Sequence, residues 1–179
     1  GRAAVYHGFV TGPSSAHPEV KGTIISSDSL DYGYPNIAFS GRSKNESQAI
    51  IGFDFSSKND FPGVGAIYFN NNNEHSDLQV LVNGSSYMDR QNGTGERWGD
   101  YFGIQPKFNS PGYVYLTGYY SLTANNNSTW VSELVSPDTS IVHDCPVATG
   151  SKVYPNPTGI YEDINLEFEV SVAQDVSAY

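Results

Sequence analysis

The chain has 179 residues, enough for one domain of ordinary size. Its net charge of −10 would repel a phosphate backbone, which argues against nucleic-acid binding. An apolar run of about 18 residues does not occur, so no membrane-spanning helix is predicted. The single cysteine, Cys145, cannot form an internal disulfide.

The chain order of apolar, aromatic and turn residues predicts an all-β fold. Aromatic residues make up 13% of the chain, and turns rich in Asn, Gly and Ser separate short apolar runs. No long stretch has apolar residues at helical spacing. We expect strands at about 3–10, 22–27, 35–40, 48–56, 64–70, 78–83, 101–105, 113–121, 129–135, 164–172 and 175–179. Short strands at near-even spacing are typical of a sandwich, a barrel or a propeller.

An internal repeat favours the propeller. Gly33 and Gly99 are 66 residues apart (99 − 33), and Gly52 and Gly118 have the same separation. Around them an aromatic-glycine turn, a strand, an apolar strand with a central glycine and an edge strand occur twice in the same order. A period of about 60 residues suits a large four-stranded blade. We therefore predict a partial β-propeller of about two four-stranded antiparallel blades in residues 1–136, with a single β-sandwich as the alternative.

A turn motif supports the same interpretation. The segment from Thr123 to Trp130 resembles the Asp-box of sialidase-like propellers, with Asn125 in place of Asp and Asn127 in place of Gly. Asparagine forms the same side-chain turn bonds and tolerates positive φ. The resemblance implies a hairpin turn between outer strands of a blade, with Trp130 packed into that blade. The alternative is an Asn-rich hairpin that matches the pattern by accident.

Aromatic and charged residues gather at two positions of the repeat and are candidate ligand-binding residues. Tyr34 lies in the first, and Arg97, Trp98, Asp100 and Tyr101 lie in the second. These segments resemble the terminal blades of secreted Bacteroidota propellers. Exposed aromatic rings there would stack on sugars or on partner side chains. If the segment is buried, Trp98 belongs to the core and Arg97 and Asp100 pair across the turn.

Catalytic and metal-binding motifs are not evident. The carboxylates cannot be paired from the sequence as a glycosidase would need, so enzymatic activity is left open. The four histidines show no metal-ligand spacing: His7, His17, His75 and His143. No cofactor is predicted, although Ca²⁺ is conceivable at the oxygen-rich run 70–77, for which a solvated turn is the alternative. A metal held by His143, Asp144 and Cys145 would require three neighbouring residues to converge on one ion.

The C-terminal region carries a second resemblance. Tyr154, Pro155, Asn156 and Pro157 form an extended segment that cannot be helical. Strict apolar/polar alternation follows over 164–172, the pattern of a half-buried strand. Together they resemble the start of the C-terminal sorting domain of type IX secretion cargo, a family exported by Bacteroidota, although the family's later strands are absent. The alternative is a proline-rich linker into an ordinary β-domain.

This resemblance implies a domain plan and a location. A linker at 137–152 would join the blades to a truncated sorting domain at 153–179, and we expect the chain to be part of a longer protein. The implied location is the cell surface or the exterior, and the implied partners are the type IX translocon and its shuttle proteins. Asp28-Ser29-Leu30 resembles the acceptor of Bacteroidota O-glycosylation, which makes Ser29 a candidate glycan site.

These observations predict an exported recognition scaffold that binds glycans or protein partners through blade loops. One alternative is a fragment of a secreted glycoside hydrolase or peptidase whose catalytic part lies elsewhere in the protein. A second alternative is a structural subunit that joins a surface assembly through open strand edges.

Overall fold

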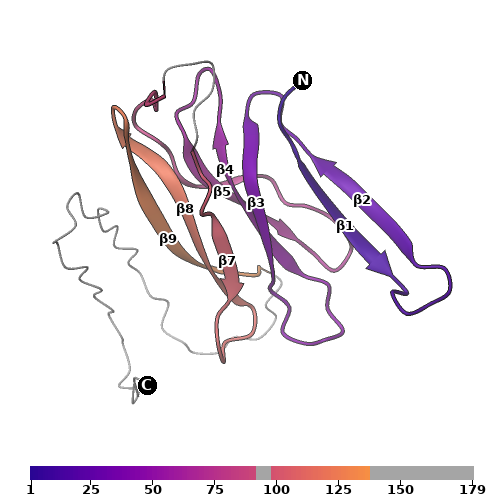
Figure 1. Ribbon diagram of the computed structural model, residues 1–179. Coiled ribbons are helices and arrows are strands. Elements are labelled where there is room, and N and C mark those ends of the chain that lie inside the picture. The colour runs from indigo at the N-terminus through magenta and orange to yellow at the C-terminus, as the bar shows by residue number, and fades with distance from the viewer. Residues whose placement is uncertain (92–97, 138–179) are drawn as a thin grey trace, which may run out of the picture.

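The computed structural model describes residues 1–91 and 98–137, and within them the fold is all-β (Figure 1). The nine strands in these described residues are β1 Val5–Thr11, β2 Glu19–Ile25, β3 Asp31–Phe39, β4 Ala49–Ser56, β5 Gly63–Phe69, β6 Gln79–Val82, β7 Gly103–Pro106, β8 Tyr113–Thr123 and β9 Asn126–Val135. No helix in the described part is long and apolar enough to cross a membrane.

The strands form three antiparallel sheets, each connected in sequence order. β1 and β2 make a two-stranded ribbon, which we call the ribbon. β3, β4, β5 and β6 make the central sheet, and β7, β8 and β9 make the outer sheet. Figure 1 shows the ribbon (indigo) on one side of the central sheet and the outer sheet on the other. The outer sheet packs on the central sheet through β8 against β4 and β5, and through β7 beside β3.

The central sheet is therefore covered on both faces. One face joins Ile51, Phe53 and Phe55 to residues of the ribbon in a single apolar cluster. The opposite face places Ile50 and Val64 against Val114, Leu116 and Tyr120 of the outer sheet. β4 is buried from Ala49 to Phe55 on both of its faces. A continuous apolar run, rather than an alternating one, is what a strand covered on both sides requires.

Two glycines allow the central and outer sheets to approach each other. A Cβ added at Gly52 would collide with the side chains of Leu116 and Phe102. A Cβ added at Gly118 would lie 2.8 Å from both methyl carbons of Val64. These two glycines, which the repeat pairs in the sequence, thus both lie at the interface between the central and outer sheets. Gly33, from the other pair of the repeat, has open space around it and does not lie in such a contact.

The predicted all-β class and the nine strands before residue 136 are confirmed, with shifts at their ends. The aromatic-glycine turn expected around Gly33 is wrong, because Gly33 lies within β3, whose register against β4 is irregular between Gly33 and Asn36. The grouping also differs from two four-stranded blades, because β1 and β2 form a separate ribbon and the outer sheet has three described strands. The expected strands 164–172 and 175–179, the linker and the sorting segment lie outside the described residues.

Candidate functional site

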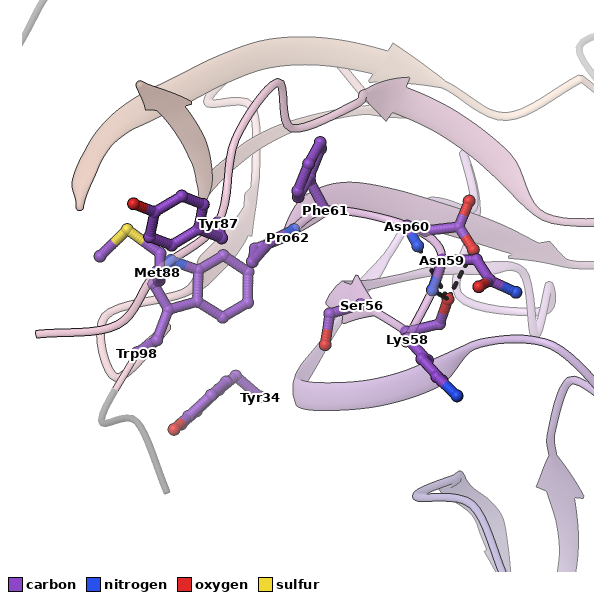
Figure 2. A pocket seen from close by; sticks show the side chains of 11 residues that line it. Tyr34, Ser56, Lys58, Asn59, Asp60, Phe61, Pro62, Tyr87, Met88 and Trp98 are labelled. Atoms are coloured by element: carbon purple, nitrogen blue, oxygen red, sulfur yellow. Dashed lines mark hydrogen bonds between the residues drawn. The ribbon is translucent and has the colours of Figure 1, made fainter. Parts of the chain in front are cut away.

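A pocket of about 470 Å³ lies at the end of β4 (Figure 2). One wall is the β4–β5 connection from Ser56 to Pro62. The other wall is formed by Tyr34, Tyr87, Met88 and Trp98. Figure 2 shows the aromatic rings of this wall grouped on one side, with the polar side chains of the connection on the other. The pocket thus combines apolar rings with hydrogen-bonding groups, as sites for small polar ligands do.

Tyr34 reaches the pocket because the backbone of β3 bulges there. Gly33 is opposite Asp54 and Asn36 is opposite Gly52, so Tyr34 and Pro35 together face one residue of β4. Tyr34 has a φ of 53°, which is uncommon for a bulky residue and even more so before a proline. Bulges re-aim side chains, and strained residues concentrate at functional sites.

Gly99 supplies the contact that places Trp98 beside Tyr34. It has a φ of 85°, and an added Cβ would overlap the Tyr34 ring and lie 2.7 Å from Asp54 Oδ2. Only glycine combines this backbone conformation with such close packing. Trp98 is half-buried, and its indole N–H has no hydrogen-bond partner among the described residues.

The polar wall is organised by its own hydrogen bonds. The Ser57 hydroxyl accepts bonds from the backbone N–H groups of Asn59 and Asp60, both at 3.0 Å, and donates to Asp60 Oδ2 at 2.6 Å. Serine turns of this kind fix short loops without regular structure. The loop is therefore shaped before any ligand arrives, which reduces the ordering cost of binding.

The β8–β9 hairpin holds the segment that carries Tyr87 and Met88. Asn125, with a φ of 60°, donates its backbone N–H to the Tyr87 carbonyl at 3.1 Å. Its side-chain Oδ1 accepts the backbone N–H of Asp89 at 2.6 Å. Arg90 Nε donates to the Asn125 carbonyl at 2.5 Å. Asn125 of the predicted Asp-box-like turn therefore holds the backbone of the segment that forms this wall of the pocket.

A buried carboxyl lies behind the aromatic wall. Asp54 on β4 accepts the backbone N–H of Tyr119 at 3.3 Å through Oδ1, while Oδ2 is buried without a partner in the described part of the chain. Burial raises the pKa of Asp54 to about 8, and the Tyr119 bond offsets only part of this effect. The carboxyl is therefore largely protonated at neutral pH. Asp54 does not line the pocket, so we regard it as part of the interface between the sheets.

The structure brings together only some of the predicted ligand-binding residues. Tyr34 and Trp98 both line the pocket. Tyr101 is 78% exposed and Asp100 is exposed, and neither residue lines the pocket. Arg97 lies outside the described residues, so its expected pairing with Asp100 stays a prediction.

The turn motif is placed at the β8–β9 hairpin. Thr123 pairs with Asn126, whose side-chain amide donates to the Thr123 hydroxyl at 3.0 Å. Asn127 follows in β9, opposite Ser121. Trp130 packs on the core of the outer sheet, with its ring edge-to-face to Tyr120 at 6.3 Å.

The other predicted sites are placed as follows. Ser29 is exposed between β2 and β3, and its glycosylation stays a prediction. In the oxygen-rich run, Asn70 Oδ1 accepts backbone N–H groups of Asn72 and Glu74, as in an ordinary side-chain turn. No group of three metal-binding side chains occurs in residues 1–91 and 98–137. The residues Tyr154, Pro155, Asn156 and Pro157 lie outside that part.

Several pocket residues were not singled out from the sequence. Phe61, Tyr87 and Met88 lie in connections between strands, where an apolar residue alone does not indicate a site. Asp54 did carry a signal, because it is the one acid in the otherwise apolar run from Ala49 to Phe55. A lone carboxylate within a buried strand predicts either a partner or a raised pKa.

The chain matches no protein-family model, and the comparison with curated proteins and with solved structures gave no significant match.

Proposed function

We propose that this protein is an exported recognition module that binds a neutral glycan in the pocket between Tyr34, Tyr87 and Trp98. The observation that carries the proposal is the aromatic wall facing a preformed polar loop. A pyranose ring has faces rich in C–H groups and a rim of hydroxyls. Rings such as Tyr87, which is 53% exposed, offer the apolar contact, and the loop offers donors and acceptors for the rim.

Charge favours a neutral ligand over an acidic one. The chain carries a net charge of −10, which disfavours the approach of polyanionic glycans. Lys58 and Asp60 are the charged residues among those described that line the pocket, and their charges compensate each other. Asp60 is the one carboxylate among these residues, whereas glycoside hydrolysis ordinarily uses a pair. Binding is therefore favoured over hydrolysis as the function of this pocket.

The test compares two tyrosines. The full chain is screened on an array of neutral and acidic glycans, and the Kd of the best neutral ligand is measured by calorimetry. Tyr87→Ala removes an exposed ring from the pocket, and we expect the Kd to rise about tenfold, the loss of about 1.4 kcal/mol of stacking. Tyr101→Ala is the matched control, because Tyr101 is exposed but does not line the pocket, and it should leave the Kd unchanged.

Two results would contradict the proposal. If no neutral glycan on the array binds the protein, neutral glycans are not the ligands of this pocket. Equal weakening by Tyr87→Ala and Tyr101→Ala would place the sugar on the outer surface rather than in the pocket.

The wider proposal is that the chain is a propeller-like scaffold and type IX secretion cargo, with the translocon and its shuttle proteins as partners. Face-to-face packing of consecutive antiparallel sheets supports blades. The resemblance at residues 153–157 supports export. In a Bacteroidota source, the native protein should reach the cell surface or the medium only when the type IX translocon is functional. Surface delivery without that translocon would overturn the export proposal.

A further inference from the structure

Two histidines that are 68 residues apart in the sequence lie side by side where the ribbon contacts Phe69 of β5. His7 lies on β1, and His75 lies in the β5–β6 connection, where it bridges back to Phe69. Their ring nitrogens, His7 Nδ1 and His75 Nε2, are 3.3 Å apart. Both rings pack on Phe69, with centroid distances of 4.5 and 4.9 Å. This pair lies at the opposite end of β5 from the aromatic pocket, which the β4–β5 connection borders.

The spacing of the two nitrogens suits a metal ion. Two imidazoles bound to one tetrahedral zinc ion at about 2.0–2.1 Å each have nitrogens about 3.3–3.4 Å apart. The rings are close to perpendicular, at 87°, with centroids 5.4 Å apart. The two nitrogens are also within hydrogen-bond distance of each other, so a metal would bind when both rings carry their proton on the other nitrogen.

The protonation and exposure of the pair are also suitable. Burial lowers the pKa of His7 from its ordinary value, and the neighbouring His75 lowers it further. Burial likewise lowers the pKa of His75. Both rings are consequently neutral at pH 7, the form that binds metals. They are half-buried rather than enclosed, which leaves room for further ligands.

We propose that His7 and His75 together bind a zinc ion or a similar borderline divalent cation, which fastens the ribbon to the central sheet. No third His, Cys, Asp or Glu joins the pair among the described residues, so water or an external donor completes the coordination. Imidazole suits zinc, copper and nickel, whereas magnesium prefers oxygen ligands. The site is independent of the proposed glycan pocket.

The test uses zinc alone as the probe on the metal-free full chain. Zn²⁺ should raise the Tm of the wild-type protein, and Mg²⁺ should not. His75→Gln should raise the Kd for Zn²⁺ at least tenfold and abolish the Tm shift, because one of two ligands is lost. His7→Phe is a second variant that keeps the aromatic packing on Phe69 and removes the nitrogen. His17→Gln, at an exposed histidine, is the matched control and should bind zinc as the wild type does.

Two outcomes would overturn the proposal. The first is a wild-type protein whose Tm does not respond to Zn²⁺. The second is a zinc response that persists in both His75→Gln and His7→Phe, which would place the ion elsewhere in the chain.

Discussion

The central sheet and the ribbon are built from similar antiparallel pairs but differ in how their faces are covered. β4 of the central sheet is buried on both faces, between the ribbon and the outer sheet. β2 of the ribbon is exposed along its length except at Ile25. The ribbon contributes Val5 and Ile25 to the core and adds contacts of His7 and Phe9 with Phe69.

This difference shows what backbone pairing does and does not determine. Register-perfect pairing of β1 with β2 satisfies backbone hydrogen bonds, yet a two-stranded ribbon has little apolar area to bury. The central sheet gains its stability from two packed faces. We therefore expect substitutions in the central sheet to affect the free energy of unfolding far more than those in the ribbon.

The largest effect is expected at the centre of β4. Phe53 is 0% exposed and its ring contacts Tyr32 at a centroid distance of 4.4 Å. Phe53→Ala should reduce the free energy of unfolding by about 3–5 kcal/mol, from lost burial and a residual cavity. Phe108→Ala is the matched control, since Phe108 is 88% exposed and its removal should change stability by less than about 0.5 kcal/mol. Urea unfolding measures both, and a small loss in Phe53→Ala would show that the central sheet is not tightly packed.

The second prediction concerns the polar group between the central and outer sheets. Because the pKa of Asp54 is about 8 in the folded protein and about 4 in the unfolded chain, the folded state binds more protons between these values. Its contribution to stability is therefore complete below about pH 4 and is lost as the pH rises toward 8. The slope should approach about 1.4 kcal/mol per pH unit in this window.

Asp54→Asn isolates this effect from the other titrating groups. Asparagine retains the oxygen that accepts the Tyr119 N–H but does not titrate. The difference in unfolding free energy between the variant and the wild type should thus grow steadily from pH 5 to pH 8. Parallel stability curves for the two proteins would refute the raised pKa of Asp54.

The third prediction compares two glycines in neighbouring strands, one at the interface between the sheets and one in open space. Gly52→Ala places a methyl group against Leu116 and Phe102, and we expect a loss of about 1–3 kcal/mol from overpacking. Gly33→Ala meets open space, and its effect should be neutral or slightly stabilising. Thermal unfolding of both variants measures the difference. Equal effects would mean that the central and outer sheets are farther apart in solution.

The strands could be predicted from the sequence, but their grouping could not. The apolar run of β4 and the alternation in β8 indicate burial whatever the partner strand is. Neither pattern predicts that β1 and β2 pair only with each other and form a separate ribbon. The segment 32–37 contains turn-forming Gly and Pro, yet pairing with β4 keeps it in a bulged strand. In this segment, pairing with β4 outweighs the local preference of Gly and Pro for a turn.

The candidate site could be predicted only in part from the sequence. Tyr34 and Trp98 stood out because aromatic residues beside glycine in connections suit binding. Tyr87 lies near them because residues of the β8–β9 hairpin hold its segment, among them Asn125, which is 38 residues further along the chain. The nitrogens of His7 and His75 meet through the docking of the ribbon on β5, which no local spacing encodes. Contacts of this kind depend on tertiary packing.

The last comparison lies within the ribbon, where two neighbouring isoleucines on β2 test its one-sided packing. Ile25 is 8% exposed and belongs to the core, whereas Ile24 is 69% exposed on the opposite face. Ile25→Ala should reduce stability by about 2 kcal/mol, and Ile24→Ala by less than about 0.5 kcal/mol. The two variants share residue type and strand, so intrinsic strand preference cancels and only burial differs. If Ile24→Ala proved as destabilising as Ile25→Ala, the outer face of the ribbon would be covered in solution, and the contrast between ribbon and central sheet would disappear.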